Sequence, residues 1–293
     1  MYNCQIIKYP HGYQIRLYSQ PCGPYPDPDA DKYTLEQLAA KDKRQRAIKS
    51  WQELTGNTIP DVLSPEWIFE HSQDDIDMVM QGYADTAKRS LYSSLARTKN
   101  RVYYLARSND WDWFVTLTFD PNIVDSYDYA ACTSKLSNWF IMMRRKCPDM
   151  RYIVVPELHK SGRWHYHGLF AACDNLGFVD SGHKDKHGNT IYNVGNYRLG
   201  FTTATRVQDP ARVTVYIGKY ITKEVCAVTK GKKRYWCSRN LQQAEIDKRY
   251  YGPNGLQLLL QQLTDVADSV RSCTVEGIGT TYYIEMSEEW SDE

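Results

Sequence analysis

The sequence lacks any long apolar run: nowhere do the roughly 20 consecutive apolar residues of a membrane-spanning helix occur. Its first residues, MYNCQIIKYPHG, do not have the basic-then-apolar layout of a secretory signal. The eight cysteines are scattered and no two are spaced as C-x-x-C, which argues against a zinc ribbon or a dithiol redox site. We therefore expect a cytoplasmic protein with reduced cysteines and no membrane partner.

Two enzyme motifs are also missing. TKGKKRY at residues 229–235 lacks the leading glycine and the final Ser or Thr of the phosphate-binding loop G-x-x-x-x-G-K-[ST]. The H-E-x-x-H helix of zinc hydrolases does not occur either. At 42% hydrophobic residues, the 293-residue chain has enough apolar side chains for a sizeable core, and its length suggests about two domains.

Acidic residues are concentrated at the end of the chain. The net charge is +1, but residues 285–293 hold five acidic residues and no basic one, so residues 1–284 carry +6. Residues 86–107 hold six Lys or Arg, no acid and three tyrosines, and KGKKR at 230–234 is a second basic cluster. Such stretches suit a nucleic acid, whose bases can stack, although a solvated helix face is the alternative. The candidate contacts are Arg97, Lys99, Arg101, Lys232, Lys233 and Arg234.

The first part of the chain is expected to be a short hairpin followed by helices. Residues 4–19 read as two strands around a Pro-His-Gly turn, and 21–29 are a proline-rich connector. Helical patterns follow at 34–56 and 74–108, with SPEW at 64–67 as a helix start.

The second part of the chain predicts an α+β fold. Strands are expected at 113–120, 150–157, 163–170 and 200–207, helices at 134–147 and 211–225, and a Gly- and Asn-rich excursion at 174–200. This alternation is typical of a sheet with helices packed on one face. We expect three regions: an N-terminal region (1–108) that is a candidate DNA-binding segment, a catalytic domain (109–240) and a C-terminal extension with the acidic tail (241–293).

A candidate metal site begins at RWHYHGLF, residues 163–170. His165 and His167 alternate there with the period of a β-strand, so both face the same way. The preceding LHKSG, residues 158–162, turns the chain back at a glycine, which predicts a hairpin with the strand that ends at Glu157.

The length of that hairpin loop decides where Glu157 points. A three-residue loop ending in a left-handed Gly162 places Glu157 opposite His165, on the face of both histidines, whereas a two-residue turn places it on the other face. With the odd loop, two imidazoles and one carboxylate could hold a divalent cation and leave positions open for water and substrate.

Other histidines are weaker candidates. A lone histidine on a strand is usually a satisfied surface or core residue, and H-x-H by itself has little specificity. His159 in the turn is a weaker candidate ligand, and His183 and His187 are expected to be solvated loop residues.

A candidate nucleophile lies in VYIGKYITKE, residues 215–224. Tyr216 and Tyr220 are four residues apart, and Lys219 and Lys223 each follow a tyrosine by three, so a helix would bring all four toward one side. An unperturbed tyrosine is a poor nucleophile at neutral pH, but a nearby cation favours the phenolate. The alternative is an amphipathic helix that buries its tyrosines in the core.

Together these motifs resemble the HUH endonucleases that initiate rolling-circle replication. FVTLTFD at 114–120 resembles the family's first motif, HYHG its histidine motif and YIGKYITK its two-tyrosine motif, in the family's order. The likeness is greatest to replication proteins of small single-stranded DNA phages, filamentous phages, plasmids and related bacterial elements.

The resemblance implies a fold, an activity and partners. The fold would be a central antiparallel sheet of about five strands with helices behind it. His165, His167 and Glu157 would hold Mn²⁺ or Mg²⁺, and Tyr216 or Tyr220 would attack single-stranded origin DNA to leave a 5′-phosphotyrosine and a free 3′-OH. Lys219 and Lys223 would stabilise negative charge. A separate helicase and polymerase of a bacterial host would complete replication.

Two other functions remain open from the sequence. A two-tyrosine transposase or a mobilisation relaxase shares the histidine and tyrosine elements. A non-catalytic nucleic-acid-binding protein, whose histidines only pack, is the alternative from another class.

Overall fold

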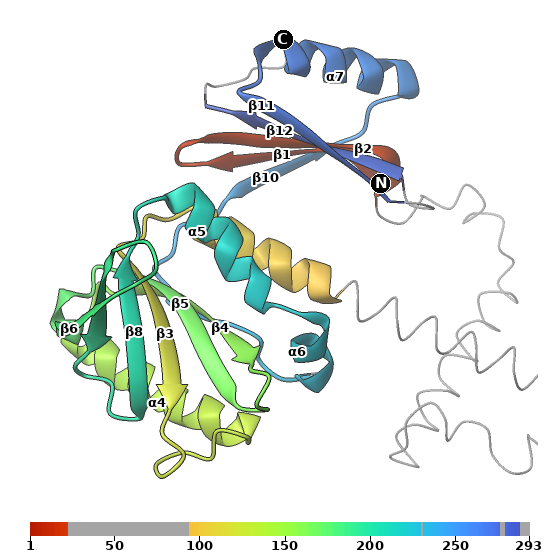
Figure 1. Ribbon diagram of the computed structural model, residues 1–293. Helices are drawn as coiled ribbons and strands as arrows, with labels where there is room; N and C mark the ends of the chain where they lie inside the picture. The colour runs from red at the N-terminus through yellow and green to blue at the C-terminus, as the bar shows by residue number, and fades with distance from the viewer. Residues whose placement is uncertain (23–93, 230, 276–278, 288–293) are drawn as a thin grey trace, which may run out of the picture. The chain divides into compact units, whose positions relative to one another are not determined.

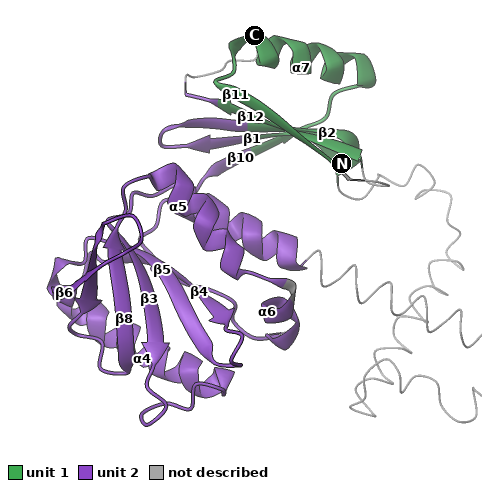
Figure 2. Ribbon diagram, viewed as in Figure 1, with its two compact units in different colours: residues 1–6, 15–90, 247–285 green, residues 7–14, 91–246, 286–293 purple. Residues whose placement is uncertain are grey.

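Two antiparallel β-sheets, one of five and one of seven strands, form the framework of the protein (Figure 1). They belong to a computed structural model that describes residues 1–22, 94–229, 231–275 and 279–287. The described residues within 1–6, 15–90 and 247–285 form one compact unit, and those within 7–14, 91–246 and 286–293 form a second (Figure 2). The α+β class predicted from the sequence is confirmed.

The five-stranded sheet joins strands from both ends of the chain in the order β10-β1-β2-β12-β11. Its strands are β1 (Tyr2–Tyr9), β2 (Gly12–Cys22), β10 (Glu245–Arg249), β11 (Ser269–Val275) and β12 (Gly279–Met286). β1 and β2 confirm the hairpin predicted at 4–19. No local pattern pointed to its pairing with C-terminal strands, because partners so far apart in sequence leave no periodic signal.

Helix α7 (Pro253–Val266) runs along this sheet beside β11 and β12 (Figure 1). Pro253 stands in its first turn, where the missing N–H is not needed for a helical hydrogen bond. Leu259 and Leu263, one turn apart on the same helix face, are buried.

The seven-stranded sheet has the order β6-β7-β8-β3-β5-β4-β9, with antiparallel pairing between the neighbouring strands. Its strands are β3 (Trp113–Phe119), β4 (Arg151–Leu158), β5 (Trp164–Ala171), β6 (Phe178–Lys184), β7 (Thr190–Val194), β8 (Gly200–Arg206) and β9 (Trp236–Cys237). The expectation of about five strands is therefore wrong. β6 and β7 lie in the Gly- and Asn-rich segment, where the mostly exposed residues of β6 leave little apolar alternation to recognise.

One face of this sheet packs on helix α4 (Tyr129–Lys146), which begins where the carboxylate of Asp128 accepts a hydrogen bond from the Ala130 amide. Strand β3 alternates strictly between buried and half-buried residues, so every second side chain points to α4. The shared core includes Val115, Leu117, Leu136, Trp139, Phe140 and Tyr166.

The opposite face carries a second layer of helices. The helix at residues 94–107, α5 (Pro210–Ile217) and α6 (Lys223–Val228) contribute to a separate core with Ile153, Val155 and Leu169 of the sheet. The expectation that helices cover only one face is therefore wrong, because both faces of β4 and β5 are apolar over these residues and both need cover.

The helix predicted at 211–225 is not continuous. α5 begins at Pro210, capped by Asp209, and ends at Ile217; a 3-10 turn η4 (Gly218–Tyr220) follows before α6. Thr222 starts α6, because its hydroxyl accepts a hydrogen bond from the Val225 amide at 3.2 Å. This cap restarts the helix in a new direction, which the tyrosine spacing alone did not reveal.

Several predicted elements lie outside the described residues: the connector beyond residue 22, the helix at 34–56, the helix start at 64–67 and most of the helix at 74–108. The described end of that last helix, residues 94–107, is helical as expected. None of the helices in the described part of the chain combines the length and the apolar character needed to cross a bilayer.

Candidate active site

The β4–β5 hairpin brings the three candidate ligands onto one face of the sheet. Glu157 pairs directly with His165 in the antiparallel register. The loop closes where the Gly162 amide donates to the carbonyl of His159 at 2.8 Å, and the φ of Gly162 is 81°, which glycine adopts without strain. The three-residue loop and the shared face of Glu157, His165 and His167 are confirmed.

His167 is held between a carboxylate and a hydroxyl. Its Nε2 lies 2.7 Å from Oε2 of Glu157, and its Nδ1 lies 3.1 Å from Oγ1 of Thr116 on β3. The hydrogen bond from His167 lowers the pKa of Glu157, so this carboxyl group is ionised at neutral pH. The threonine fixes the imidazole from behind, which is the usual role of a group hydrogen-bonded to a ligand histidine.

His165 lies against His159 of the hairpin turn. The two imidazole rings stack at 5.0 Å between centroids and 11° between planes. Burial lowers the pKa of His165, as does the nearby His159, while Glu157 opposes them by raising it. The ring is therefore neutral near pH 7, the protonation state that a metal-ligating histidine needs.

The ring of Tyr220 lies flat on His167. Their centroids are 3.6 Å apart at an angle of 11°, and the hydroxyl of Tyr220 donates a hydrogen bond of 3.0 Å to the hydroxyl oxygen of Tyr216. Phe114 on β3 contacts both tyrosines, with ring centroids 5.4 Å from Tyr216 and 6.4 Å from Tyr220. The broken helix thus still brings the two hydroxyl groups together, beside the histidine strand.

The two tyrosines differ in their surroundings. Burial raises the pKa of Tyr220, as do its hydrogen bond to Tyr216 and the nearby Glu157, so Tyr220 keeps its proton. Tyr216 is 39% exposed, and the ammonium of Lys219 lies 4.9 Å from its ring centroid. Lys223 begins α6, but its side chain lies outside the described part of the structure.

The donor groups of this face fit a divalent cation by their chemistry. An ionised carboxylate, a neutral imidazole and a second imidazole backed by Thr116 provide the mixed oxygen and nitrogen ligation that transition metals accept. In the described residues no three His, Cys, Asp or Glu side chains converge as a metal cluster. Glu157 and His167 instead contact each other directly, so a cation bound to both would replace the proton between Nε2 and Oε2.

Gly168, which completes HYHG, is required by packing on the opposite face. A Cβ at this position would lie 2.5 Å from Cγ2 of Val154 and 2.7 Å from the ring of Phe170. The absent side chain lets β5 keep its register with β4, and hence its two histidines in place.

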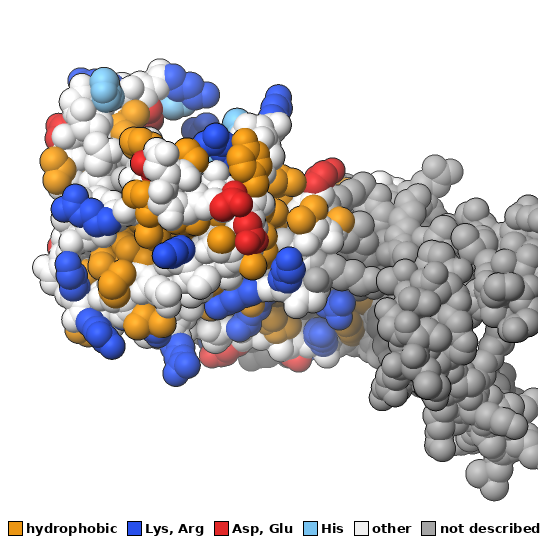
Figure 3. All heavy atoms as spheres, turned by 90° about the horizontal axis from the view of Figure 1, so that it is seen from below, with side chains coloured by type: hydrophobic (Ala, Val, Ile, Leu, Met, Phe, Trp, Pro, Cys, Tyr) orange, Lys and Arg blue, Asp and Glu red, His pale blue; other side chains and the backbone are white. Residues whose placement is uncertain are grey.

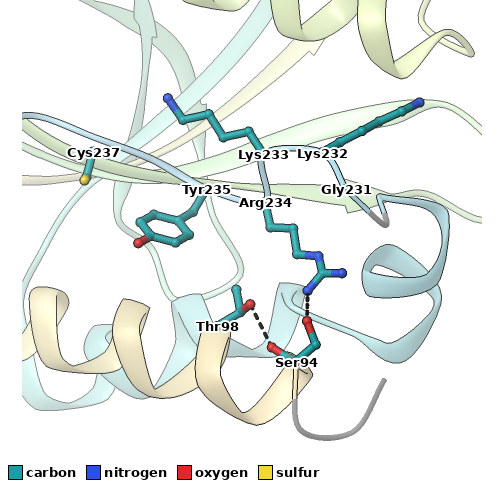
Figure 4. Close-up of a pocket in the computed structure, with 8 residues that line it drawn as sticks. All are labelled: Ser94, Thr98, Gly231, Lys232, Lys233, Arg234, Tyr235 and Cys237. Atoms are coloured by element: carbon teal, nitrogen blue, oxygen red, sulfur yellow. Dashed lines mark hydrogen bonds between the residues drawn. The ribbon is translucent and has the colours of Figure 1, made fainter. Parts of the chain in front are cut away.

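The predicted basic contacts lie in two places. Arg97, Lys99 and Arg101 are exposed on the helix at 94–107. Lys232, Lys233 and Arg234 line a pocket of about 550 Å³ together with Ser94, Thr98, Gly231, Tyr235 and Cys237 (Figure 4). Lys233 and Arg101 both act on the thiol of Cys237, whose pKa burial raises and these two charges lower.

Within the pocket, the cations have different roles. The guanidinium of Arg234 donates hydrogen bonds to Ser94 Oγ, Thr229 Oγ1 and the carbonyl of Cys226. Lys232 and Lys233 are exposed and point in different directions away from it (Figure 4). Arg234 therefore ties α6 to the helix at 94–107, while the two lysines face solvent. Figure 3 shows further Lys and Arg side chains spread over one face of the molecule.

Sequence reasoning missed Phe114 and Thr116, which organise the site from β3. Both lie in FVTLTFD, where their alternation on the less buried side of the strand was the available signal. His183 and His187 are exposed at the β6–β7 hairpin, as predicted.

The comparison with known families adds one result. Residues 112–225 match the model of a family described as Replication-associated protein, of the ORF2 type. The match covers less than half of the chain but contains β3, the β4–β5 hairpin and both tyrosines. No curated protein and no solved structure matches the chain. The match associates this segment with a family of replication proteins.

Proposed function

We propose that this protein is an HUH endonuclease that initiates rolling-circle replication by nicking single-stranded DNA at an origin. The observation that carries the proposal is the Tyr220 ring stacked on His167 at 3.6 Å, with the Tyr216 hydroxyl 3.0 Å from that of Tyr220. This arrangement lies inside the segment that matches a replication-associated family.

The proposed reaction is a transesterification. A tyrosine oxygen attacks the scissile phosphorus, the bond from phosphorus to the 3′ oxygen breaks, and the leaving 3′ oxygen takes up a proton. The products are a 5′-phosphotyrosine and a free 3′-OH, which a polymerase can extend. Because one phosphodiester replaces another, a later attack by a 3′-OH can rejoin the strand.

The surroundings of the two tyrosines favour Tyr216 for the first attack. The hydrogen bond that Tyr220 donates stabilises charge on the Tyr216 oxygen, and the ammonium of Lys219 lies on the same ring. Tyr220, by contrast, is half-buried and keeps its proton. Tyr220 would then serve as the second nucleophile, after the first has become linked to DNA.

His165, His167 and Glu157 would hold Mn²⁺ or Mg²⁺. When bound, the metal supplies Lewis-acid chemistry to the scissile phosphate. Thr116 orients His167 for this task, since its hydroxyl can accept from Nδ1–H and so turn the Nε2 lone pair outward.

Basic side chains would hold the DNA backbone. Arg101 and Lys233 both lie near Cys237, so the helix at 94–107 and the pocket provide phosphate contacts that adjoin each other. A host helicase and polymerase in the bacterial cytoplasm would then open the duplex and extend the 3′-OH.

The test is covalent capture. The protein is incubated with pooled single-stranded oligonucleotides and Mn²⁺, and its peptides are analysed by mass. We expect a nucleotide adduct on the peptide with Tyr216 and Tyr220, unchanged in Tyr127→Phe, a matched exposed tyrosine outside the pair. Intact oligonucleotides, or adduct formation that persists when both tyrosines are replaced, would contradict the proposal.

A further inference from the structure

An exposed aromatic side chain lies on the same face and in the same row of the sheet as the candidate ligands. Glu157 on β4 pairs with His165 on β5, His165 pairs with Thr118 on β3, and Thr118 pairs with Phe201 on β8. Directly paired residues in an antiparallel sheet point to the same face. With neighbouring strands about 4.8 Å apart, Phe201 stands about 10 Å from His165 across the sheet.

The side chain of Phe201 is 67% exposed. Single exposed apolar residues are common, so exposure alone carries little. What distinguishes Phe201 is the polar strip around it: Thr118 is half-buried beside it on β3 and Thr203 is exposed two residues further along β8. The adjacent row runs from His167 through Thr116 to Thr203, so both rows lead from the candidate ligands to β8.

The backbone holds Phe201 at this place. Gly200, immediately before it, has a φ of 154°, and a Cβ there would lie 2.3 Å from the carbonyl oxygen of Thr118 and 2.4 Å from the amide of Asp120. Only a glycine lets β8 approach β3 this closely, and the approach fixes Phe201 opposite Thr118. Its ring therefore stands on a rigid strand rather than on a loop.

We infer that Phe201 is a stacking platform for a base of single-stranded DNA next to the scissile phosphate. An exposed ring suits any base, because every base has a π-face, and hydroxyl groups beside it suit a sugar-phosphate backbone. The inference rests on the proposed function and adds to it a residue that positions the strand. The net charge of +6 over residues 1–284 agrees with a polyanionic occupant.

The experiment compares oligonucleotide binding by fluorescence anisotropy, using a labelled poly-dT strand without divalent cation so that no cleavage occurs. Phe201→Ala should weaken binding by about fivefold to a hundredfold, the range measured for loss of one stacked base. Phe201→Tyr should bind like the wild type. Met142→Ala is the matched control, since Met142 is 51% exposed on α4 against the other face of the sheet.

Phe201→Trp adds a direct readout. Its fluorescence should be quenched when the oligonucleotide stacks on the new indole ring, and the quenching should disappear at high salt together with binding. Equal affinities for wild type and Phe201→Ala, with wild type clearly bound, would overturn only the role of Phe201. The same holds if Phe201→Ala alters only the self-association of the protein. A wild type that does not bind single-stranded DNA would overturn both this role and the proposed function.

Discussion

The imidazole of His167 forms the surface on which the ring of Tyr220 lies, with 3.6 Å between centroids. This contact joins two motifs that are 53 residues apart in the chain, one on β5 and one in the η4 turn. A candidate metal ligand and a candidate nucleophile thereby share one van der Waals contact. Any change that moves His167 should therefore move Tyr220 as well.

Replacing a histidine should abolish strand cleavage. His165→Ala or His167→Ala removes one of three proposed ligands, so we expect a loss of at least about a hundredfold in cleavage rate, with the far-ultraviolet circular dichroism unchanged. Glu157→Ala should weaken metal binding more mildly, seen as a higher Mn²⁺ concentration for half-maximal cleavage.

The matched control for these variants is His183→Ala, because His183 is exposed on β6 away from the site. It should cleave like the wild type. Chelator-treated wild type that cleaves as fast as the Mn²⁺-loaded protein would count against the metal.

The ionised Glu157 should stabilise the fold at neutral pH. Its pKa in the folded protein is lowered from the ordinary value of a glutamate, chiefly by the hydrogen bond from His167. A depressed carboxyl pKa contributes stability above the unfolded pKa, and this stability is lost as the pH falls through the folded value. Because Glu157 is about one-third exposed, we expect Glu157→Gln to cost no more than about 1 kcal/mol at pH 7.

Urea unfolding without divalent cation at pH 7, 5 and 3 measures this effect. The wild type should be more stable than Glu157→Gln at pH 7 and 5, and the difference should vanish at pH 3. Glu245→Gln, at an exposed position of β10, should show no such pattern. A difference that stays constant down to pH 3 would show that the carboxylate charge is not responsible.

The exposed cations of the helix at 94–107 should determine how DNA binding responds to salt. Replacing Arg97, Lys99 and Arg101 by Ala should flatten the slope of log affinity against log salt by about 0.7 for each phosphate that is no longer neutralised on a single strand. Replacing Lys135, Arg144 and Arg145, which are exposed on α4, removes the same charge from another surface. Equal slopes in both triple variants would return the helix to a solvated face.

Packing at Gly168 should be intolerant of a side chain. Gly168→Ala places a methyl group 2.5 Å from Cγ2 of Val154, and such overpacking costs about 1–3 kcal/mol. Gly218→Ala is the control, since a Cβ there meets no atom within 4 Å. Thermal unfolding should show a lower midpoint for Gly168→Ala alone. Equal midpoints would mean that the sheet yields to the extra methyl group.

The sequence predicted the metal-ligand face well because strand register is set locally. An odd loop with a left-handed Gly162 forces Glu157 opposite His165, whatever the rest of the fold does. The tyrosine helix was less predictable, because the Thr222 cap competes with helical periodicity and wins. The stack of Tyr220 on His167 and the place of Phe201 depend on pairings between distant strands and helices, for which a single sequence has no periodic signal.

Covalent adduct yield on the two tyrosines, mapped by peptide mass in Tyr216→Phe, Tyr220→Phe and the double variant, separates the possible mechanisms. Phenylalanine keeps the ring stack and removes only the hydroxyl group, so the fold should be unchanged. We predict that each single variant retains some adduct, with the greater loss in Tyr216→Phe, and that the double variant retains none. Loss of all adduct in one single variant with wild-type yield in the other would contradict two alternating nucleophiles. Adduct on the double variant would remove both residues from the reaction.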